Sequence, residues 1–386
     1  MARSDFSLHR KLGLSLILSF APLTHGSLWE SGNWALTGAL NGSAGYDSNP
    51  TVNHDGQGAA FFQSNPVLTF ARRDSSTDFR IDSGVTTTNF ASGRLTPETD
   101  LKFDTVCSYP NAENVIPLYR AEAAWLRSSP PNEYLGARVR TEQQTFSAEG
   151  YLPVTGKLGI RSAAHYAGEN YDSAGLNQIR RGDIFLGLAY EHDPRTEISF
   201  NLGAALGHAQ PNDPLRIEDD VHSAEYYATT RWRGELTAKV SGDAFVGLGR
   251  VDYTGGYAHS NTLPVGGVDL TWAINPHRKL VLAASSGASF APDGQTGRIT
   301  RASLTFTQEI LVRWQYELRF GPAHSVYGRA SGQRTDDNWD VGMEFAYQPS
   351  QRFRVALAMN YTEQNSDKAF AQFTRNFISL GAAYRL

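Results

Sequence analysis

The chain has 386 residues, with 35 lysines and arginines against 39 aspartates and glutamates, and a formal net charge of −4. Acids and bases are interspersed, which argues against a nucleic-acid surface, so no nucleic-acid partner is expected. No run of 18 apolar residues occurs after the first 30 positions, which excludes membrane helices. Aromatic residues and glycines are spread throughout without a linker-like stretch, so we expect a single domain after the leader.

The first 26 residues have the composition of a secretory signal. Basic residues between Arg3 and Lys11 precede an apolar segment of about a dozen residues, Leu12 to Leu23, and Thr24-His25-Gly26 fits a small-x-small cleavage site. An apolar segment this short cannot span a bilayer, which disfavours a retained anchor. The sequence predicts a cleavable signal peptide at 1–26 and one mature domain at 27–386.

Alternating apolar and polar residues recur along the mature domain. Because side chains alternate between the two faces of a β-strand, each such segment predicts a strand with one apolar face. The longest alternation, Ala302 to Phe320 with Gln308 as its single exception, predicts one strand far longer than the usual five or six residues. Its apolar face requires an apolar medium, which we take to be lipid. Further strands are expected at Trp34–Tyr46, Leu158–Tyr166, Ile184–Tyr190, Ile198–Leu206, Val268–Ile274, Val341–Tyr347, Phe353–Tyr361 and Ile378–Leu386.

Turn-forming residues separate these segments. Asp, Asn, Gly and Pro set turn dihedrals, so short clusters of them predict turns at 74–76, 129–132, 192–195, 275–278, 321–324 and 348–351. Longer polar segments predict loops at 47–60, 92–117, 168–181, 207–222, 254–262, 291–298 and 363–372. Short turns on one rim and long loops on the other are typical of an outer-membrane barrel.

The predicted fold is all-β: a single antiparallel transmembrane β-barrel of about 18 strands, with 16 also compatible, short periplasmic turns and longer extracellular loops. Closure is required because an open sheet edge in hydrocarbon leaves backbone groups unpaired, at a cost of several kcal/mol each. Thr99–Thr155 allows two interpretations. Either Gln143–Phe146 is a tight outer turn, or Leu101–Cys107 is a strand and Glu133–Leu152 is one long strand.

Aromatic residues near the predicted strand ends distinguish a membrane barrel from the alternative, a soluble β-sandwich or propeller. In a soluble fold these side chains would point into a core, whereas in a membrane barrel they form girdles at the two headgroup levels. The expected girdle residues are Trp34, Tyr46, Trp125, Tyr166, Tyr190, Trp272, Trp339, Tyr347, Tyr361 and Tyr384.

Charged residues of both signs occupy the positions predicted to face the lumen. A ring of 16 to 18 strands is too wide for side chains to fill, so these residues either line water and select solutes or merely pair with one another across strands. The candidate pore-lining residues are Arg138, Arg140, Arg161, Glu309, Arg313, Glu317, Arg319, Glu344 and Arg354. The wider set adds Arg120, Glu122, Glu142, Lys157, His165, Asp183, Glu191, Glu197, Asp269, Asp340 and Arg385.

Four of the arginines, Arg138, Arg140, Arg313 and Arg319, suggest a more specific hypothesis. Guanidinium groups bind carboxylate and phosphate in a bidentate manner, so this group is a candidate site for an anionic solute.

An enzyme built on a barrel is the main competing class. Asn41-Gly42-Ser43-Ala44-Gly45 does not have the Gly-x-Ser-x-Gly spacing of a nucleophile elbow. Histidines 54, 208, 222 and 259 are spread over the predicted loops 47–60, 207–222 and 254–262. We therefore expect no enzyme, no catalytic residues and no cofactor.

Two acidic groups are candidates for binding calcium or for bridging lipopolysaccharide through divalent ions: Glu218-Asp219-Asp220 with His222, and Asp336-Asp337 with Asp340. Neither has the spacing of a dedicated calcium loop, so no metal is assigned. Cys107 is the single cysteine and is expected to be structurally incidental.

Gly45-Tyr46-Asp47-Ser48-Asn49-Pro50, at the end of the first expected strand, resembles the segment that opens proteins of the putative β-barrel porin 2 family of Gram-negative outer membranes. Segments 272–280 and 347–355 resemble the strand–turn–strand hairpins of the same family, and a looser similarity extends over most of the mature chain. The resemblance implies an outer-membrane pore. Because members are often associated with capsular or extracellular polysaccharide export, it also implies a candidate cargo, and it supplies no catalytic residues.

The expected function is a passive channel for hydrophilic solutes in the bacterial outer membrane, with an extracellular polysaccharide export conduit as the specific hypothesis. A plugged structural or adhesive barrel, or a barrel enzyme, is the alternative. Expected partners are outer-membrane lipid, lipopolysaccharide, the barrel-assembly machinery and polysaccharide.

Overall fold

The fold was analysed in a computed structural model that describes residues 27–386, except for 55, 75, 111–117, 214, 216–219, 256–258 and 330–331. The predicted signal peptide therefore lies outside the described residues, as do Glu218 and Asp219 of the first acidic group. Among the described residues, no helix is long and apolar enough to cross a membrane.

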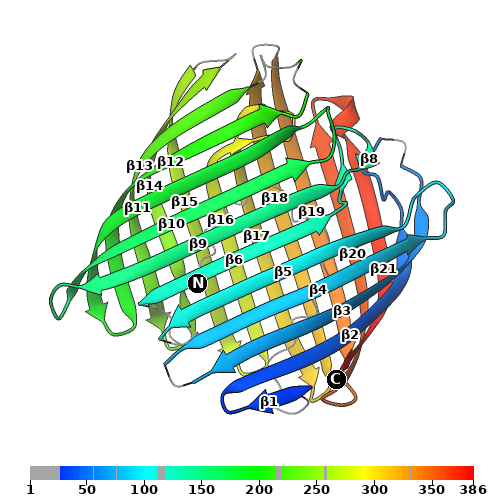
Figure 1. The fold of residues 1–386 in the computed structure, drawn as a ribbon, viewed down its shortest axis with the longest axis horizontal. Helices are drawn as coiled ribbons and strands as arrows, with labels where there is room; N and C mark the ends of the chain where they lie inside the picture. Colours follow the sequence, from blue (N-terminus) through cyan, green and yellow to red (C-terminus); the bar gives the residue numbers. More distant parts are fainter. Residues whose placement is uncertain are drawn as a thin grey trace.

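Long antiparallel strands make up nearly all of this structure (Figure 1). One 19-stranded sheet contains β1, which pairs only with β2, and a ring of 18 further strands. Outside the ring, β7 (Pro131–Asn132) pairs with β8 (Ala137–Arg138), and a 3-10 helix covers Ala369–Ala371. The strands of the main sheet are β1 (Trp29–Ser31), β2 (Trp34–Asp47), β3 (Ala59–Arg73), β4 (Asp78–Phe90), β5 (Glu98–Tyr109), β6 (Tyr119–Ser128), β9 (Thr141–Pro153), β10 (Leu158–Tyr171), β11 (Asn177–Asp193), β12 (Thr196–Pro211), β13 (Val221–Thr237), β14 (Val240–Gly255), β15 (His259–Asn275), β16 (Arg278–Phe290), β17 (Thr296–Leu311), β18 (Trp314–Arg329), β19 (Gly332–Tyr347), β20 (Phe353–Ser366) and β21 (Phe373–Arg385).

The ring closes where β2 pairs with β21, so the barrel is continuous and the predicted count of about 18 strands is confirmed. Closure removes the sheet edges that hydrocarbon would not tolerate. At this seam a Cβ on Gly45 would lie 2.1 Å from the carbonyl oxygen of Ile378, so only glycine permits this approach of the two strands. Asp47 and Arg375 form an ion pair across the same seam, with 2.5 Å between Oδ2 and Nη2.

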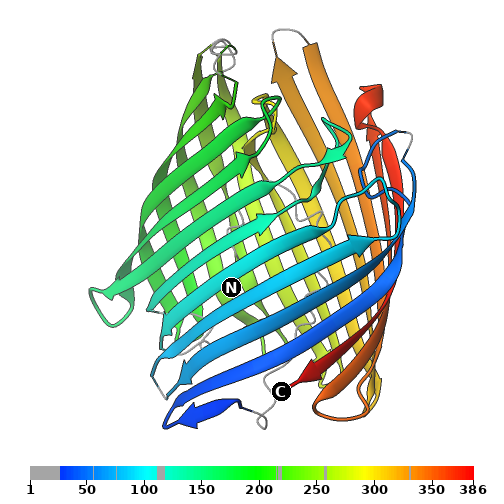
Figure 2. The ribbon, with the colours of Figure 1, turned by 45° about the vertical axis from the view of Figure 1, so that its right-hand side comes forward.

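The two rims differ in their connections. Four of the turns on the rim that holds β1 and the end of β21 contain two residues each, and we call this the short-turn rim (Figure 2). The opposite long-loop rim carries the longer connections 48–58, 129–140 and 212–220. Asp74, in a short turn, accepts backbone N–H groups from Ser76 and Thr77, which lowers the pKa of its carboxyl. This asymmetry confirms the predicted contrast between short turns on one rim and longer loops on the other.

The predicted single strand from Ala302 to Phe320 is wrong: it is the hairpin of β17 and β18, with a two-residue connection at 312–313. In this hairpin Gln308 pairs with Tyr316 and Glu309 with Gln315, so paired residues have the same parity in sequence. Alternation therefore continues through the turn without a break. The length of the Ala302–Phe320 segment could have indicated a hairpin, because a membrane strand needs only about 9–11 residues.

Three further sequence predictions need correction. The predicted loop 92–117 contains β5, so Leu101–Cys107 is a strand, and the long strand proposed at Glu133–Leu152 begins only at Thr141. The predicted turn at 321–324 lies inside β18, where the ladder with β17 skips from Arg301–Ala323 to Leu304–Phe320 around Pro322. Proline has no N–H to give to a ladder, which explains the local interruption.

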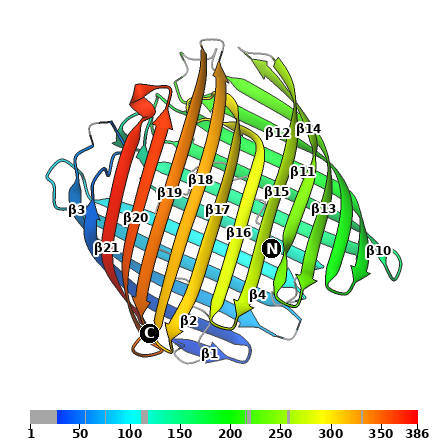
Figure 3. The same ribbon diagram turned by 180° about the vertical axis from the view of Figure 1, so that it is seen from behind.

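Strand register confirms the predicted outer face. On β11, Ile184 and Leu188 are 63% and 68% exposed, whereas the alternate residues Asp183 and Ala189 are buried. All ten predicted girdle aromatics also face outward. Residues that pair across an antiparallel ladder lie on the same side of the sheet, so the outward face can be traced from strand to strand around the ring. Figure 3 shows the barrel from behind, where β15 to β20 run side by side.

Candidate functional site in the barrel lumen

Only some of the predicted pore-lining residues lie in the barrel wall and face the lumen. Six of them alternate along their strands with outward-facing residues and therefore face the lumen: Arg161, Glu317, Arg319, Glu344, Arg354 and, at the short-turn end of β17, Glu309. The other three lie outside the wall: Arg138 is in the β7–β8 hairpin, Arg140 is exposed in the same connection, and Arg313 is in the turn between β17 and β18.

The proposed arginine group is therefore not one site. Arg138 and Arg140 lie on the long-loop rim and Arg313 lies on the short-turn rim, so the height of the barrel separates them. Arg319 pairs with Glu317 of its own strand, with 3.2 Å between Nε and Oε1. In the wider set, Glu142 is on the outer face, where it accepts the indole N–H of Trp125, and Lys157 lies in a short turn.

An ionic network covers the lumen face of strands β9 to β14. Arg161 Nη1 lies 2.8 Å from Glu149 Oε1, and Arg161 also pairs with Glu197 at 2.5 Å. Arg233 joins Glu149, at 2.5 Å, to Asp243, at 3.0 Å. Arg233 of β13 reaches Glu149 of β9, and Arg161 of β10 reaches Glu197 of β12. The network therefore joins strands that are not neighbours in the ring and stiffens this wall.

The β7–β8 connection crosses the lumen at the long-loop rim. Glu133, just after β7, accepts a hydrogen bond from Arg334 of β19 at 3.2 Å, and Arg334 also pairs with Asp336 at 2.6 Å. The Arg334 guanidinium lies 4.5 Å from the ring centroid of Tyr134 and 5.4 Å from that of Phe370. Because β19 lies nearly opposite β6 and β9 in the ring, this contact spans the lumen.

The tip of the β16–β17 hairpin also bends inward. Pairing of β16 with β15 ends at Ser286–Gly266, whereas pairing with β17 continues to Phe290–Thr296. Beyond this point the Asn177 backbone N–H, at the start of β11, donates to the carbonyl oxygen of Pro292 at 2.7 Å. Arg181 donates to the carbonyl oxygen of Ala288 at 3.4 Å. The tip therefore reaches the wall several strands away from its own.

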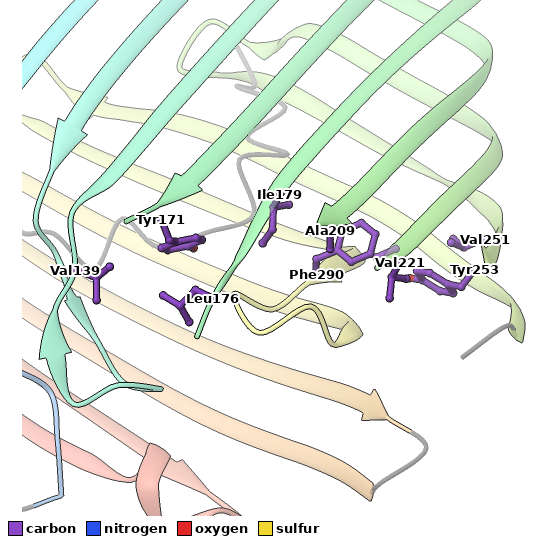
Figure 4. Packing of buried hydrophobic residues seen from close by; sticks show 10 residues of the cluster. Val139, Tyr171, Leu176, Ile179, Ala209, Val221, Val251, Tyr253 and Phe290 are labelled. Carbon is purple, nitrogen blue, oxygen red and sulfur yellow. The ribbon is translucent and has the colours of Figure 1, made fainter. Parts of the chain in front are cut away.

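Apolar residues pack around this inward tip (Figure 4). The rings of Phe290 and Tyr253 meet edge to face, with 6.1 Å between centroids. The cluster consists of Val139, Tyr171, Leu176, Ile179, Ala209, Val221, Val251, Tyr253, Ala288 and Phe290. A polar lumen thus carries an apolar contact at its long-loop end, which favours the bent position of the tip.

Neither bridge was predicted from the sequence. Glu133 and Arg334 are 201 residues apart, and no local pattern relates them. The second acidic group also comes apart: Asp336 pairs with Arg334 in the lumen, whereas Asp337 accepts from His324 on the outer face at 2.7 Å. Of the histidines considered, the structure brings together His208 and His222, whose rings stack 4.1 Å apart.

A closed barrel with an apolar outer face, aromatic girdles and a charged lumen defines a porin-like outer-membrane β-barrel, and this fold implies an outer-membrane location. Residues 212–386 match the sequence profile of the family described as Putative beta-barrel porin 2. The resemblance to this family is thereby confirmed over the segment that carries β13 to β21, half of the ring.

Solved structures match most of this chain at low sequence identity. OccK2 (OpdF) of Pseudomonas aeruginosa matches with a TM-score of 0.45 and 12% identity, over 91% of this chain and 98% of that one. OccAB3 of Acinetobacter baumannii matches with a TM-score of 0.42 and 9% identity, over 91% and 99% of the two chains. The copper transporter OprC matches with a TM-score of 0.42 and 10% identity, over 86% of this chain, which spans 61% of that transporter. No curated protein matches the sequence.

Proposed function

We propose that the barrel is a channel for small hydrophilic solutes whose passage is narrowed, at the long-loop rim, by two segments of its own chain. The observation that most directly supports this proposal is the pair of bridges across the lumen, Glu133 to Arg334 and Asn177 to Pro292. Inward-folded segments restrict the solutes that an otherwise wide ring of 18 strands would admit.

The lumen toward the short-turn rim supports passage of polar solutes. Arg80 and Asp82 of β4 form an ion pair at 2.6 Å in which the arginine side chain is 53% exposed. Lys102 and Asp104 of β5 pair at 2.5 Å with the lysine 43% exposed. Charged groups that stay exposed inside a barrel favour a water-filled space, and the alternation of signs favours weak rather than strong ion selectivity.

An extracellular polysaccharide conduit is the narrower hypothesis that the family resemblance suggests. A chain of sugars passing through this lumen would require both bridges to open. We therefore place small solutes first and treat a polysaccharide as a cargo of the opened barrel.

The test is single-channel conductance of the refolded protein in a planar bilayer, with and without an anionic oligosaccharide. We expect discrete steps for the native chain and larger steps for Arg334→Ala, because that substitution removes the guanidinium that holds Glu133. Arg354→Gln is the matched control, since Arg354 pairs with Glu344 on the neighbouring strand and tethers no loop.

The results of this experiment distinguish a gated polysaccharide route from a plugged barrel. Blockade of Arg334→Ala by the oligosaccharide, without blockade of the native chain, would support a gated polysaccharide route. Absence of steps from verified folded barrels of both proteins would contradict a channel and indicate a plugged structural or adhesive barrel.

A further inference from the structure

Two histidines and an aspartate meet on the outside of the long-loop rim. His208 of β12 and His222 of β13 are directly opposite one another in the ladder, and their rings stack with 4.1 Å between centroids and 13° between planes. Asp220, which precedes β13, places Oδ1 2.6 Å from His208 Nε2 and 3.9 Å from His222 Nε2. One carboxylate oxygen therefore faces two imidazole nitrogens.

The group faces outward, away from the lumen bridges. The next outward residue of β12 toward the membrane is Leu206, which is 69% exposed, and the outward residues of β13 below His222 are Ala224 and Tyr226. These apolar and aromatic residues mark the lipid-facing band. The histidines thus lie just above the band, at the level where outer-leaflet headgroups meet water.

The arrangement differs from an ordinary histidine–acid pair. His324 with Asp337, at 2.7 Å, and His277 with Glu309, at 3.1 Å, each contain a single imidazole and one carboxylate. Among residues whose placement is described, the trio of His208, Asp220 and His222 is the group of three whose potential ligand atoms all lie within 4.8 Å of one another.

We propose that His208, Asp220 and His222 bind a divalent transition metal ion, for which Zn²⁺ is the natural probe. Two imidazoles and one carboxylate suit Zn²⁺, Cu²⁺ or Ni²⁺, whereas Ca²⁺ and Mg²⁺ prefer oxygen ligands. Three protein ligands leave the remaining coordination position open to water or to an anionic headgroup on the solvent side.

The distances require only side-chain adjustment. Bonds of 2.0–2.1 Å in a tetrahedral site place ligand atoms about 3.3 Å apart. The gap between His208 and Asp220 would therefore widen, and the gap between His222 and Asp220 would narrow, each by less than about 1 Å.

The backbone already holds the three ligands in place. His208 and His222 are fixed opposite each other by the β12–β13 ladder. Gly255, at φ +108°, lets the end of β14 approach so closely that a Cβ there would lie 2.2 Å from the Asp220 carbonyl oxygen. Arg180 of β11 pairs with His208 in the ladder, but its guanidinium donates to Gln178 at 3.2 Å.

The experiment is a titration of Zn²⁺ into the full chain, refolded in detergent without a histidine tag and followed by isothermal calorimetry. Co²⁺ provides a second readout, because its visible absorption reports nitrogen coordination directly. We expect one ion per chain, at least tenfold weaker binding in both His208→Gln and His222→Gln, and weaker binding in acid, where protons compete with the ion for the imidazole nitrogens. His324→Gln, the matched control, should bind as the native chain does.

Gel mobility of unheated against heated samples verifies that each variant is a folded barrel, so a loss of binding cannot arise from misfolding. A His324→Gln effect equal to that of His208→Gln would overturn the proposal. So would the absence of saturable binding to the native chain, or competition by Ca²⁺ at the same concentration as Zn²⁺.

Discussion

Arg375 and Asp47 are 328 residues apart in sequence and form a bidentate ion pair, with Nε 3.0 Å from both carboxylate oxygens and Nη2 2.5 Å from Oδ2. They join the last strand of the barrel to the first. Asn49 reinforces the same junction, because its side-chain amide donates to the carbonyl oxygen of Thr374 at 3.1 Å. The segment from Gly45 to Pro50, which carries the family resemblance, is thus the part of the chain that closes the ring.

Arg375→Gln should weaken closure. The substitution leaves the buried Asp47 carboxylate without its cation, a change that costs about 3–5 kcal/mol at a buried pair. We expect a lower free energy of unfolding in urea and a lower yield of folded barrel in lipid vesicles. Arg80→Gln breaks an exposed pair and should cost less than about 1 kcal/mol. Equal effects of the two substitutions would show that the seam pair does not stabilise closure.

A disulfide should lock the inward tip. The 2.7 Å hydrogen bond limits the separation of the Asn177 and Pro292 Cα atoms to about 6.6 Å, within disulfide range. In a Cys107→Ser background, Asn177→Cys with Pro292→Cys should give lower mean conductance when oxidised than when reduced, by at least twofold. Cys107→Ser alone should not respond to reductant. Conductance that is the same in both redox states would show that the tip does not control the passage.

Asp243→Asn should destabilise the ionic wall. Asp243 pairs with both Arg231 and Arg233, and its side chain is buried, so its loss leaves two guanidinium groups undercompensated. We expect a loss of about 3 kcal/mol in the free energy of unfolding. Glu235→Gln removes the partner of the exposed Arg195 and should change that free energy by less than about 1 kcal/mol. A small effect of Asp243→Asn would argue that the wall is held by backbone pairing alone.

Cys107 should face lipid. It lies on the outward parity of β5, and the next residue, Ser108, is buried on the lumen side. A fluorophore on Cys107 should be quenched by lipids with brominated acyl chains, whereas the same label on Ser108→Cys in a Cys107→Ser background should not. Quenching of both labels would contradict this assignment of faces, because neighbouring residues of a strand must point to opposite sides of the sheet.

Ion selectivity should depend on Arg319 and not on Arg313. Arg319 lies on the lumen face of β18 and Arg313 in the exposed turn before it. We expect Arg319→Gln to shift the reversal potential toward cation preference in a salt gradient, because it leaves Glu317 without its cation, and Arg313→Gln to leave that potential unchanged. Identical reversal potentials for the native chain and Arg319→Gln would exclude this residue from the selective part of the lumen.

Period-two alternation was enough to predict the barrel, its outer face and the girdle, because parity at positions such as Trp272 and Tyr384 follows from local sequence alone. Strand ends were less predictable. The two-residue turn at 312–313 preserves parity, so the β17–β18 hairpin was predicted as one strand. Contacts across the lumen depend on where connections fold, and nothing near Glu133 in sequence indicates Arg334. Likewise, pairing of His208 with His222 requires the register of β12 and β13, which alternation does not determine.

The inward bend of β16 leaves part of its neighbour with a free edge. From His259 to Val265, β15 pairs with β14 and has no ladder to β16. Backbone groups on that edge need water, since hydrocarbon would leave them unsatisfied at several kcal/mol each. Pro264 lies within this stretch and offers no N–H, as suits an edge position. Water must therefore reach this edge of β15, so the bend limits how far the hydrocarbon layer can rise on this side of the barrel.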